Sequence, residues 1–279
     1  MRGATGTTDP PSSVRSADGT AISFDRTGDG PPLILVGGAL SDRTAAAPLA
    51  ALLAPRFTVY AFDRRGRGDR GDTPPYAVDR EVEDLGALID DAGGSAFVFG
   101  HSSGAALAIE AAVRGLPIPK LALYEPPFIV DDTRAPLPDD YEATLREMAA
   151  SGHPGDTVAY FMTTGVGLPS EEVEQMRHAP TWPAMEALAH TLTYDGAVMG
   201  TNMSGRPLPS EWAAAITMPT LVMDGGDSPA WQTHAVDALA SLLPDVRRRT
   251  LDGQGHGADP EVLAPILTEF FVREGPGRS

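Results

Sequence analysis

Apolar runs alternate with helical segments along most of this chain, and that alternation limits the folds open to it. The runs PPLILVGG (31–38), SAFVFG (95–100) and LALY (121–124) are continuous, which is typical of strands buried on both faces of a sheet. The segment 78–94 has apolar residues at helical spacing and ends in two glycines. This rhythm predicts an α/β fold with a mostly parallel sheet flanked by helices.

The alternation stops between residues 130 and 215 and resumes with MPTLVMDGG at 218–226. A length of 279 residues fits one α/β domain with an insertion better than two independent domains. We therefore expect a core of residues 13–129 and 216–279, interrupted by a helical cap insertion at 130–215. Residues 1–12 are polar and rich in Thr, Pro and Ser, and we expect a flexible N-terminal tail there.

One turn of the predicted sheet contains candidate catalytic residues. Gly100-His101-Ser102-Ser103-Gly104 follows a buried strand and precedes a helix, which is the context of a nucleophile elbow. Glycines allow such a tight turn, and the turn projects the Ser102 hydroxyl above the sheet. The next backbone N–H, that of Ser103, lies at a helix N-terminus and is predicted to stabilise an oxyanion. The alternative is that Ser102 only caps the helix.

A serine hydroxyl needs a base at neutral pH, and His256 is the predicted base. It lies in LDGQGHG (251–257), directly after the last predicted strand and before the last helix. His101 is adjacent to Ser102, but its side chain should point away, and we interpret it as structural. The other histidines are interpreted as surface or core residues: His153, His178, His190 and His234.

These features together resemble the α/β-hydrolase superfamily over roughly residues 13–275. The chain order of Ser102, an acid and His256, the sequences GHSSG and FDRRGRG (62–68), and the cap-like insertion carry the resemblance. The chain is most similar to small cofactor-free members with a helical cap, such as esterases and haloperoxidase-like hydrolases. The resemblance implies the α/β-hydrolase fold, a Ser–His–acid triad, no cofactor and no metal.

The loop after the first apolar run departs from the family pattern. The family usually has His-Gly there, whereas this chain has Gly37-Gly38. The resemblance implies that the backbone N–H of Ala39, or of Leu40 one residue further, supplies the second oxyanion-hole donor. Without the histidine side chain that normally braces it, we expect this loop to be more mobile.

The position of the acid also departs from the family pattern. Most members carry it after the penultimate strand, three residues past a glycine, where this chain has Ser228, with Asp227 one residue short. A subset of the family carries it after the preceding strand, where this chain has Glu125 followed by two prolines. Glu125 is the preferred acid, Asp227 the alternative, and Asp224 remains a further candidate.

The insertion is rich in Trp and Met, which pack adaptably around apolar ligands. The predicted substrate contacts come from the loop after the first apolar run and from the insertion: Gly38, Leu40, Trp182, Met185 and Met203. The alternative interpretation is that many of the insertion residues form the cap's own small core. The run FDRRGRGDRGD (62–72) is interpreted as a structural loop in which Asp63 and the arginines pair, with an anion-binding clamp as the alternative.

The net charge and the absence of cysteine restrict the classes of partner and of chemistry that we expect for this protein. A formal net charge of −17 repels phosphate backbones and anionic membrane surfaces, so neither nucleic acid nor membrane is expected as a partner. The absence of cysteine excludes disulfides and thiolate chemistry and fits a cytoplasmic protein. We expect a small-molecule substrate and a monomer or homodimer.

The resulting prediction is a serine hydrolase that cleaves a carboxylic ester or lactone of small to medium, largely apolar character through an acyl-enzyme on Ser102. Two alternatives stay open. One is a C–C bond hydrolase or acyltransferase that uses the same triad. The other is a ligand-binding protein on a hydrolase scaffold.

Overall fold

The computed structural model of the chain describes residues 12–68 and 71–273. Its eight-stranded sheet has the order β1-β2-β4-β3-β5-β6-β7-β8. Strand β2 pairs antiparallel with both β1 and β4. Every neighbouring pair from β4 to β8 is parallel, which confirms the predicted α/β class. The strands are β1 (Ser12–Arg15), β2 (Ala21–Thr27), β3 (Pro32–Val36), β4 (Thr58–Phe62), β5 (Phe97–His101), β6 (Leu121–Tyr124), β7 (Thr220–Gly225) and β8 (Val246–Leu251).

The central strands are buried on both faces, as their continuous apolar sequences predict. Every residue of β4, β6 and β7 is buried. Strand β8 lies at the edge of the sheet and carries Arg247, Arg248 and Arg249. Charged side chains on an edge strand oppose pairing with a strand of another chain, so this edge is protected against aggregation.

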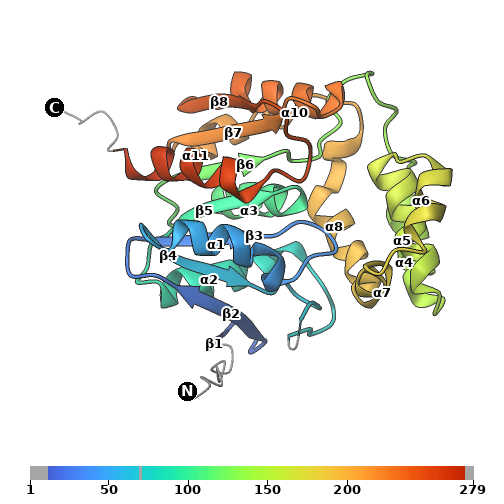
Figure 1. Ribbon diagram of the computed structural model, residues 1–279, viewed down its shortest axis with the longest axis horizontal. Coiled ribbons are helices and arrows are strands. Elements are labelled where there is room, and N and C mark those ends of the chain that lie inside the picture. The colour runs from blue at the N-terminus through green and yellow to red at the C-terminus, as the bar shows by residue number, and fades with distance from the viewer. Residues whose placement is uncertain (1–11, 69–70, 274–279) are drawn as a thin grey trace, which may run out of the picture.

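Helices cover both faces of the sheet (Figure 1). On one face, α1 (Ala47–Leu53) and α11 (Pro260–Val272) pack against the sheet in one apolar cluster. On the other face, α2 (Val78–Asp91), α3 (Ser103–Val113) and α10 (Ala230–Leu242) pack in a second cluster. The two clusters fix the sheet from both sides, so the carboxyl ends of the parallel strands form a rigid platform.

The segment between β6 and β7 forms a helical cap, visible as a separate lobe beside the sheet in Figure 1. The cap has its own apolar cluster, which includes Tyr141, Leu145, Val158 and Trp182. Its helices are α4 (Tyr141–Ala150), α5 (Pro154–Tyr160), the π-helical turn η2 (Phe161–Val166), α6 (Ser170–Met176), α7 (Trp182–Ala187), η3 (Ala189–Thr191), α8 (Leu192–Met199), η4 (Gly200–Met203) and α9 (Trp212–Ala215).

One prediction about the periphery meets the structure only in part. The predicted tail, residues 1–12, lies outside the described residues except for Ser12, which begins β1 rather than ending a flexible tail.

Within residues 12–68 and 71–273, none of the helices combines the length and the apolar content that crossing a membrane requires.

Candidate active site

Ser102 occupies the sharp turn between β5 and α3. Its backbone is at φ 56° and ψ −128°, a conformation that a residue with a side chain adopts only under strain. The turn is tight because α3 begins directly against the neighbouring loop: a Cβ built on Gly104 would lie 2.3 Å from the carbonyl oxygen of Val36. A side chain at 104 would push the helix away, so the sequence pattern and the strained serine have one steric cause.

The structure brings Ser102, His256 and Glu125 together. The Ser102 Oγ lies 3.0 Å from His256 Nε2, and His256 Nδ1 lies 2.8 Å from Glu125 Oε2. The three side chains come from the ends of β5, β8 and β6, which meet at one edge of the sheet because the strands are parallel. This arrangement lets the imidazole accept the serine proton on one nitrogen while a carboxylate holds the other.

Glu125 is fully buried, and its carboxylate is fixed by two contacts. The backbone N–H of Gly225 donates to Oε1 at 2.7 Å, and His256 contacts Oε2. Burial alone would raise the pKa of Glu125, but the hydrogen bonds from His256 and Gly225 outweigh burial and hold it below the usual range. Asp227 is exposed, and among the described carboxylates only Glu125 contacts His256. Asp224, the further candidate, instead pairs with Arg248.

Backbone strain marks the same site. Among the described residues, three that are not glycine have positive φ: Leu40 at 54°, Ser102 at 56° and Glu125 at 45°. They are the predicted oxyanion loop, the predicted nucleophile and the predicted acid. Such conformations cost free energy and persist where the surrounding structure enforces them, often at functional sites.

The oxyanion loop lies against the nucleophile, since a Cβ on Gly38 would be 2.9 Å from Ser102 Cβ. The N–H of Ser103 is one of the first-turn donors that α3 cannot use internally. The sequence led us to expect a more mobile loop, because the bracing histidine of the family is absent. The guanidinium of Arg67 donates to the Gly38 carbonyl, and Arg64 donates to the Gly37 carbonyl at 3.4 Å. These arginines brace the loop where the family histidine is absent.

A buried ionic network ties this loop to the cap. Asp195 of α8 accepts hydrogen bonds from Arg64 at 2.7 Å, from Arg67 at 2.8 Å and from the Ser103 hydroxyl at 2.7 Å. Arg64 also forms a two-bond contact with Glu81, at 2.7 and 2.8 Å. Burial alone would raise the pKa of Asp195, but the two arginines outweigh it and hold the pKa below its usual range. The cap is therefore anchored to the first residue of α3, next to Ser102.

Asp195→Asn is expected to destabilise the protein strongly. The change leaves Arg67 buried without a charged partner and removes one of the two carboxylates that pair with Arg64. Breaking a buried ion pair costs about 3–5 kcal/mol. The free energy of unfolding from urea titrations measures this. Asp156→Asn is the matched control, because Asp156 is a cap carboxylate that pairs with Arg177 but is 58% exposed, and it should cause little change. Equal effects of the two variants would contradict a special role for the network.

His101 holds the loop that carries His256. Its Nε2 donates to the His256 backbone carbonyl at 2.8 Å, and its ring centroid lies 4.9 Å from that of the His256 ring. Burial, with a further contribution from nearby His256, lowers the pKa of His101 to about 4. The side chain therefore stays neutral at physiological pH, which agrees with the structural role that the sequence suggested.

Acid should destabilise the fold through His101. The unfolded chain binds this proton near the ordinary histidine pKa of about 6.5, whereas the folded state binds it only near 4. Between these values the unfolded state holds more protons, so stability is lost as the pH falls from about 6.5 towards 4. Melting temperatures of the protein and of His101→Gln, which keeps a donor but does not titrate, measure the effect. Parallel curves for the two proteins across this range would contradict it.

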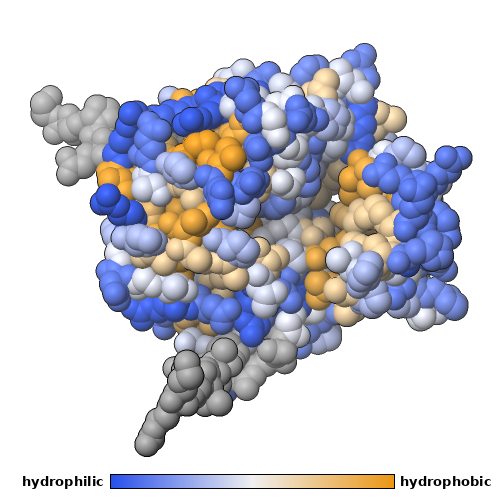
Figure 2. Space-filling view, viewed as in Figure 1, coloured by the Kyte–Doolittle hydropathy of each residue, from blue (hydrophilic) through white to orange (hydrophobic). Residues whose placement is uncertain are grey.

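A cavity of about 1160 Å³ lies between the sheet edge and the cap, with Ser102 and His256 in its wall. Figure 2 shows the corresponding hollow between core and cap, with apolar residues on both sides. The sequence-predicted contacts Gly38, Leu40 and Met203 line it. The apolar part of its wall includes Leu40, Tyr141, Phe161, Met162, Leu168, Met199 and Met203.

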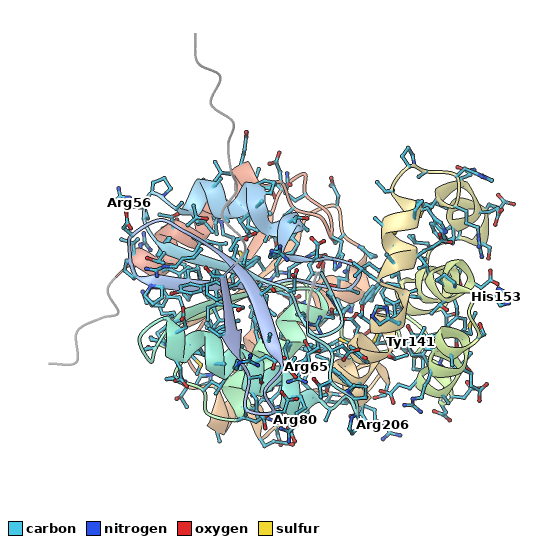
Figure 3. The ribbon with its side chains drawn as sticks, turned by 90° about the horizontal axis from the view of Figure 1, so that it is seen from below. Arg56, Arg65, Arg80, Tyr141, His153 and Arg206 are labelled. Atoms are coloured by element: carbon cyan, nitrogen blue, oxygen red, sulfur yellow. The ribbon has the colours of Figure 1, made fainter. Side chains whose placement is uncertain are left out.

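Two of the predicted substrate contacts are wrong. Trp182 and Met185 do not line the cavity but belong to the cap's own apolar cluster, and Trp182 donates to Glu186 at 3.1 Å. They lie on α7, which packs against α5 instead of facing the nucleophile. Figure 3 shows Tyr141 on the inner side of the cap and His153, which sequence analysis set aside, on its outer side.

The arginine-rich loop after β4 is structural, as its sequence suggested, but its partners come from elsewhere. Arg65 is held by Asp84 through two bonds of 2.7 Å and by Asp18 at 2.7 Å. Asp63 contacts Arg43 of the preceding segment rather than the arginines beside it. Arg64 and Arg67 line the cavity, yet the carboxylates described above occupy their guanidinium groups.

The chain matches the model of the Alpha/beta hydrolase family over residues 33–266. It belongs to this family. A crystal structure of an α/β-hydrolase from Sphaerobacter thermophilus is 58% identical, with a TM-score of 0.88 and coverage of 94% of this chain and 100% of that one. The present chain is also 28% identical to N-formylmaleamate deformylase of Pseudomonas putida over 249 residues, covering 86% of this chain and 88% of the relative. It is 26% identical to 2-(acetamidomethylene)succinate hydrolase of Mesorhizobium japonicum over 262 residues, covering 90% and 91%. Hydrolase activity follows from these relationships.

Sequence reasoning missed two residues of the site. Asp195 contacts Arg64 across 131 positions of the chain, and nothing in its local sequence distinguishes it from a surface carboxylate. Gln232 lies in the first turn of α10, and its side-chain nitrogen is 2.8 Å from His256 Nδ1. The only signal for Gln232 was its position soon after the end of β7, the edge at which the family usually carries its acid.

Proposed function

We propose that this α/β-hydrolase cleaves a carboxylic ester or lactone through an acyl-enzyme on Ser102. The observation that carries the proposal is the continuous chain of contacts from Ser102 Oγ to His256 at 3.0 Å and from His256 to Glu125 at 2.8 Å. A hydroxyl, an imidazole and a buried carboxylate in this order form the apparatus of nucleophilic acyl transfer.

The reaction proceeds in two halves. The Ser102 Oγ attacks the acyl carbon while His256 Nε2 takes the hydroxyl proton, and the N–H groups of Ser103 and Ala39 stabilise the oxyanion. The C–O bond to the alcohol then breaks, and His256 gives its proton to the leaving oxygen. Water attacks the acyl-enzyme with His256 again as base, and the acid is released with Ser102 restored. Glu125 stabilises the imidazolium that forms in each half.

The cavity supports a small to medium substrate of largely apolar character. Met162, Met199 and Met203 give the wall adaptable apolar side chains. Arg64 and Arg67 face carboxylates of the protein itself, so they add no net positive charge for an anionic substrate. Among the lining residues, Gly38, Leu40 and Met203 were expected from the sequence to touch substrate.

Hydrolysis of a small amide is the second candidate. The names of two curated relatives describe amide-containing acids as their substrates, and both relatives match most of the length of this chain. The same triad cleaves an amide once His256 protonates the leaving nitrogen. Arg206, an exposed residue of the cavity wall, offers a cation that suits a substrate carboxylate.

A matched substrate panel tests the proposal. p-Nitrophenyl acetate and butyrate, a δ-lactone and an N-formyl amide of similar size should rank with the esters and lactone first. A burst of p-nitrophenol equal to the enzyme concentration is expected if the acyl-enzyme accumulates, and a fluorophosphonate should label Ser102 stoichiometrically. Product analysis distinguishes hydrolysis from C–C cleavage and acyl transfer. Absence of both turnover and labelling would favour a ligand-binding protein and overturn the proposal.

A further inference from the structure

Gln232 touches the catalytic imidazole. It lies in the first turn of α10, is 4% exposed and contributes to the wall of the cavity. Its side-chain nitrogen Nε2 is 2.8 Å from His256 Nδ1, the same distance at which Glu125 contacts that nitrogen. Nδ1 therefore has two partners, whereas the mechanism above uses only Glu125.

The proton on the imidazole decides what Gln232 can do. For His256 to accept the Ser102 proton on Nε2, its neutral ring must carry its hydrogen on Nδ1. Nδ1 is then a donor with no free lone pair, and a partner at 2.8 Å must be an acceptor. A primary amide has one acceptor end and one donor end of nearly equal shape, exchanged by a half-turn about its last bond.

The two orientations of the amide have opposite consequences. With the carbonyl oxygen towards Nδ1, the N–H of the ring is shared between Glu125 and Gln232, and Nε2 is free to accept from Ser102. With the NH₂ towards Nδ1, the ring must accept there and carry its hydrogen on Nε2, which faces the serine with a donor. The second tautomer cannot act as the base.

We infer that Gln232 is a positioning residue whose amide adopts the orientation a half-turn from the one in which Nε2 faces the ring. Its carbonyl oxygen then accepts from His256 Nδ1–H and, with Glu125, selects the productive tautomer. The inference rests on the proposed function, because it concerns the base of that reaction. Gln232 supplies no charge. The buried carboxylate of Glu125 supplies the charge, and the amide supplies a second acceptor and limits rotation of the ring.

A reciprocal exchange follows from this geometry. Glu and Gln have the same size, and both side chains lie 2.8 Å from one nitrogen. The double variant Glu125→Gln/Gln232→Glu keeps one carboxylate and one amide at Nδ1 and conserves the buried volume. If Gln232 is a true partner of the ring, a carboxylate at position 232 should restore part of the kcat that Glu125→Gln loses.

The exchange is tested on the full chain with the best ester of the panel. We expect kcat of the double variant to be at least about tenfold above that of Glu125→Gln alone, because a carboxylate again faces Nδ1. Gln232→Met, which keeps the length but has no acceptor, should lower kcat about tenfold, the effect of one lost hydrogen bond, with KM within about twofold. Gln175→Met, on the exposed surface of α6, is the matched control and should match the unaltered protein.

The pH profile separates positioning from mere packing. The titratable groups that face His256 in the described structure are Glu125 from the end of β6 and His101 from the end of β5. Gln232→Met leaves both in place, so a shift of the acid limb of kcat/KM to lower pH reports loss of an acceptor that stabilised the imidazolium. An unshifted profile with unchanged kcat would overturn the inference.

A readout without substrate keeps this test independent of the proposed function. In protein labelled with ¹⁵N-histidine, the His256 signals should report a hydrogen on Nδ1, and Gln232→Met should move the Nδ1 resonance. An unmoved resonance, or a folded double variant no faster than Glu125→Gln, would overturn the role of Gln232. Failure of the function itself has a different signature, namely no ester turnover and no fluorophosphonate labelling of the unaltered protein.

Discussion

Replacing Ser102 with alanine is expected to lower kcat for the best ester by about 10⁶, because loss of the nucleophile in other serine hydrolases has an effect of this size. The alanine variant keeps the backbone of the turn and the N–H of Ser103, so the oxyanion hole and the cavity should persist. Steady-state kinetics measure the loss, and thermal melting shows that the fold survives.

Ser103→Ala is the neighbouring control for this prediction. Alanine at 103 keeps the backbone N–H that faces the oxyanion but loses the hydroxyl that donates to Asp195 at 2.7 Å. Its kcat should stay within about a hundredfold of the unaltered protein, while stability falls by about 1–3 kcal/mol because a buried hydrogen bond is lost. If Ser102→Ala kept as much turnover as Ser103→Ala, Ser102 would not be the nucleophile.

The elements of the core could be predicted from the sequence because their signals are local. The continuous apolar sequence of β3, β5 and β6 reflects burial on both faces, and each of these three strands carries this signal by itself. The elbow at Ser102 was predictable for a similar reason. Gly104 has no side chain because the next strand's carbonyl lies too close, and that steric need appears within five residues of sequence.

The cap contacts could not be predicted because periodicity does not say which side of a helix meets which partner. Trp182 and Met203 look equivalent in the sequence, yet Trp182 fills the cap's core and Met203 lines the cavity. The same limit applies to Asp195, whose role depends on arginines 128 and 131 positions away. Bracing of the oxyanion loop by Arg67 was missed because its guanidinium comes from another part of the chain. There it takes the place of the histidine that the family usually has within the loop.

The sequence favoured Glu125 as the acid but left Asp227 and Asp224 open, and this choice gives the second large prediction. Glu125→Gln should lower kcat by about 10⁴, the loss seen when an amide replaces the acid of a serine triad, because an amide favours the wrong tautomer of His256. Asp227→Asn should leave kcat within about threefold, because Asp227 is exposed and Glu125 occupies the ring. Steady-state kinetics on the best ester compare the two variants at one pH.

Burial explains why the effects should differ so widely. Glu125 is fully buried, with the Gly225 N–H holding one carboxylate oxygen and His256 contacting the other, so its charge acts on the imidazolium with little screening by water. A charge at Asp227 is hydrated and screened, and its removal changes the field at His256 only slightly. The reverse ranking, with Asp227→Asn the more damaged variant, would mean that the loop after β7 closes on His256 during turnover and that the acid is carried there.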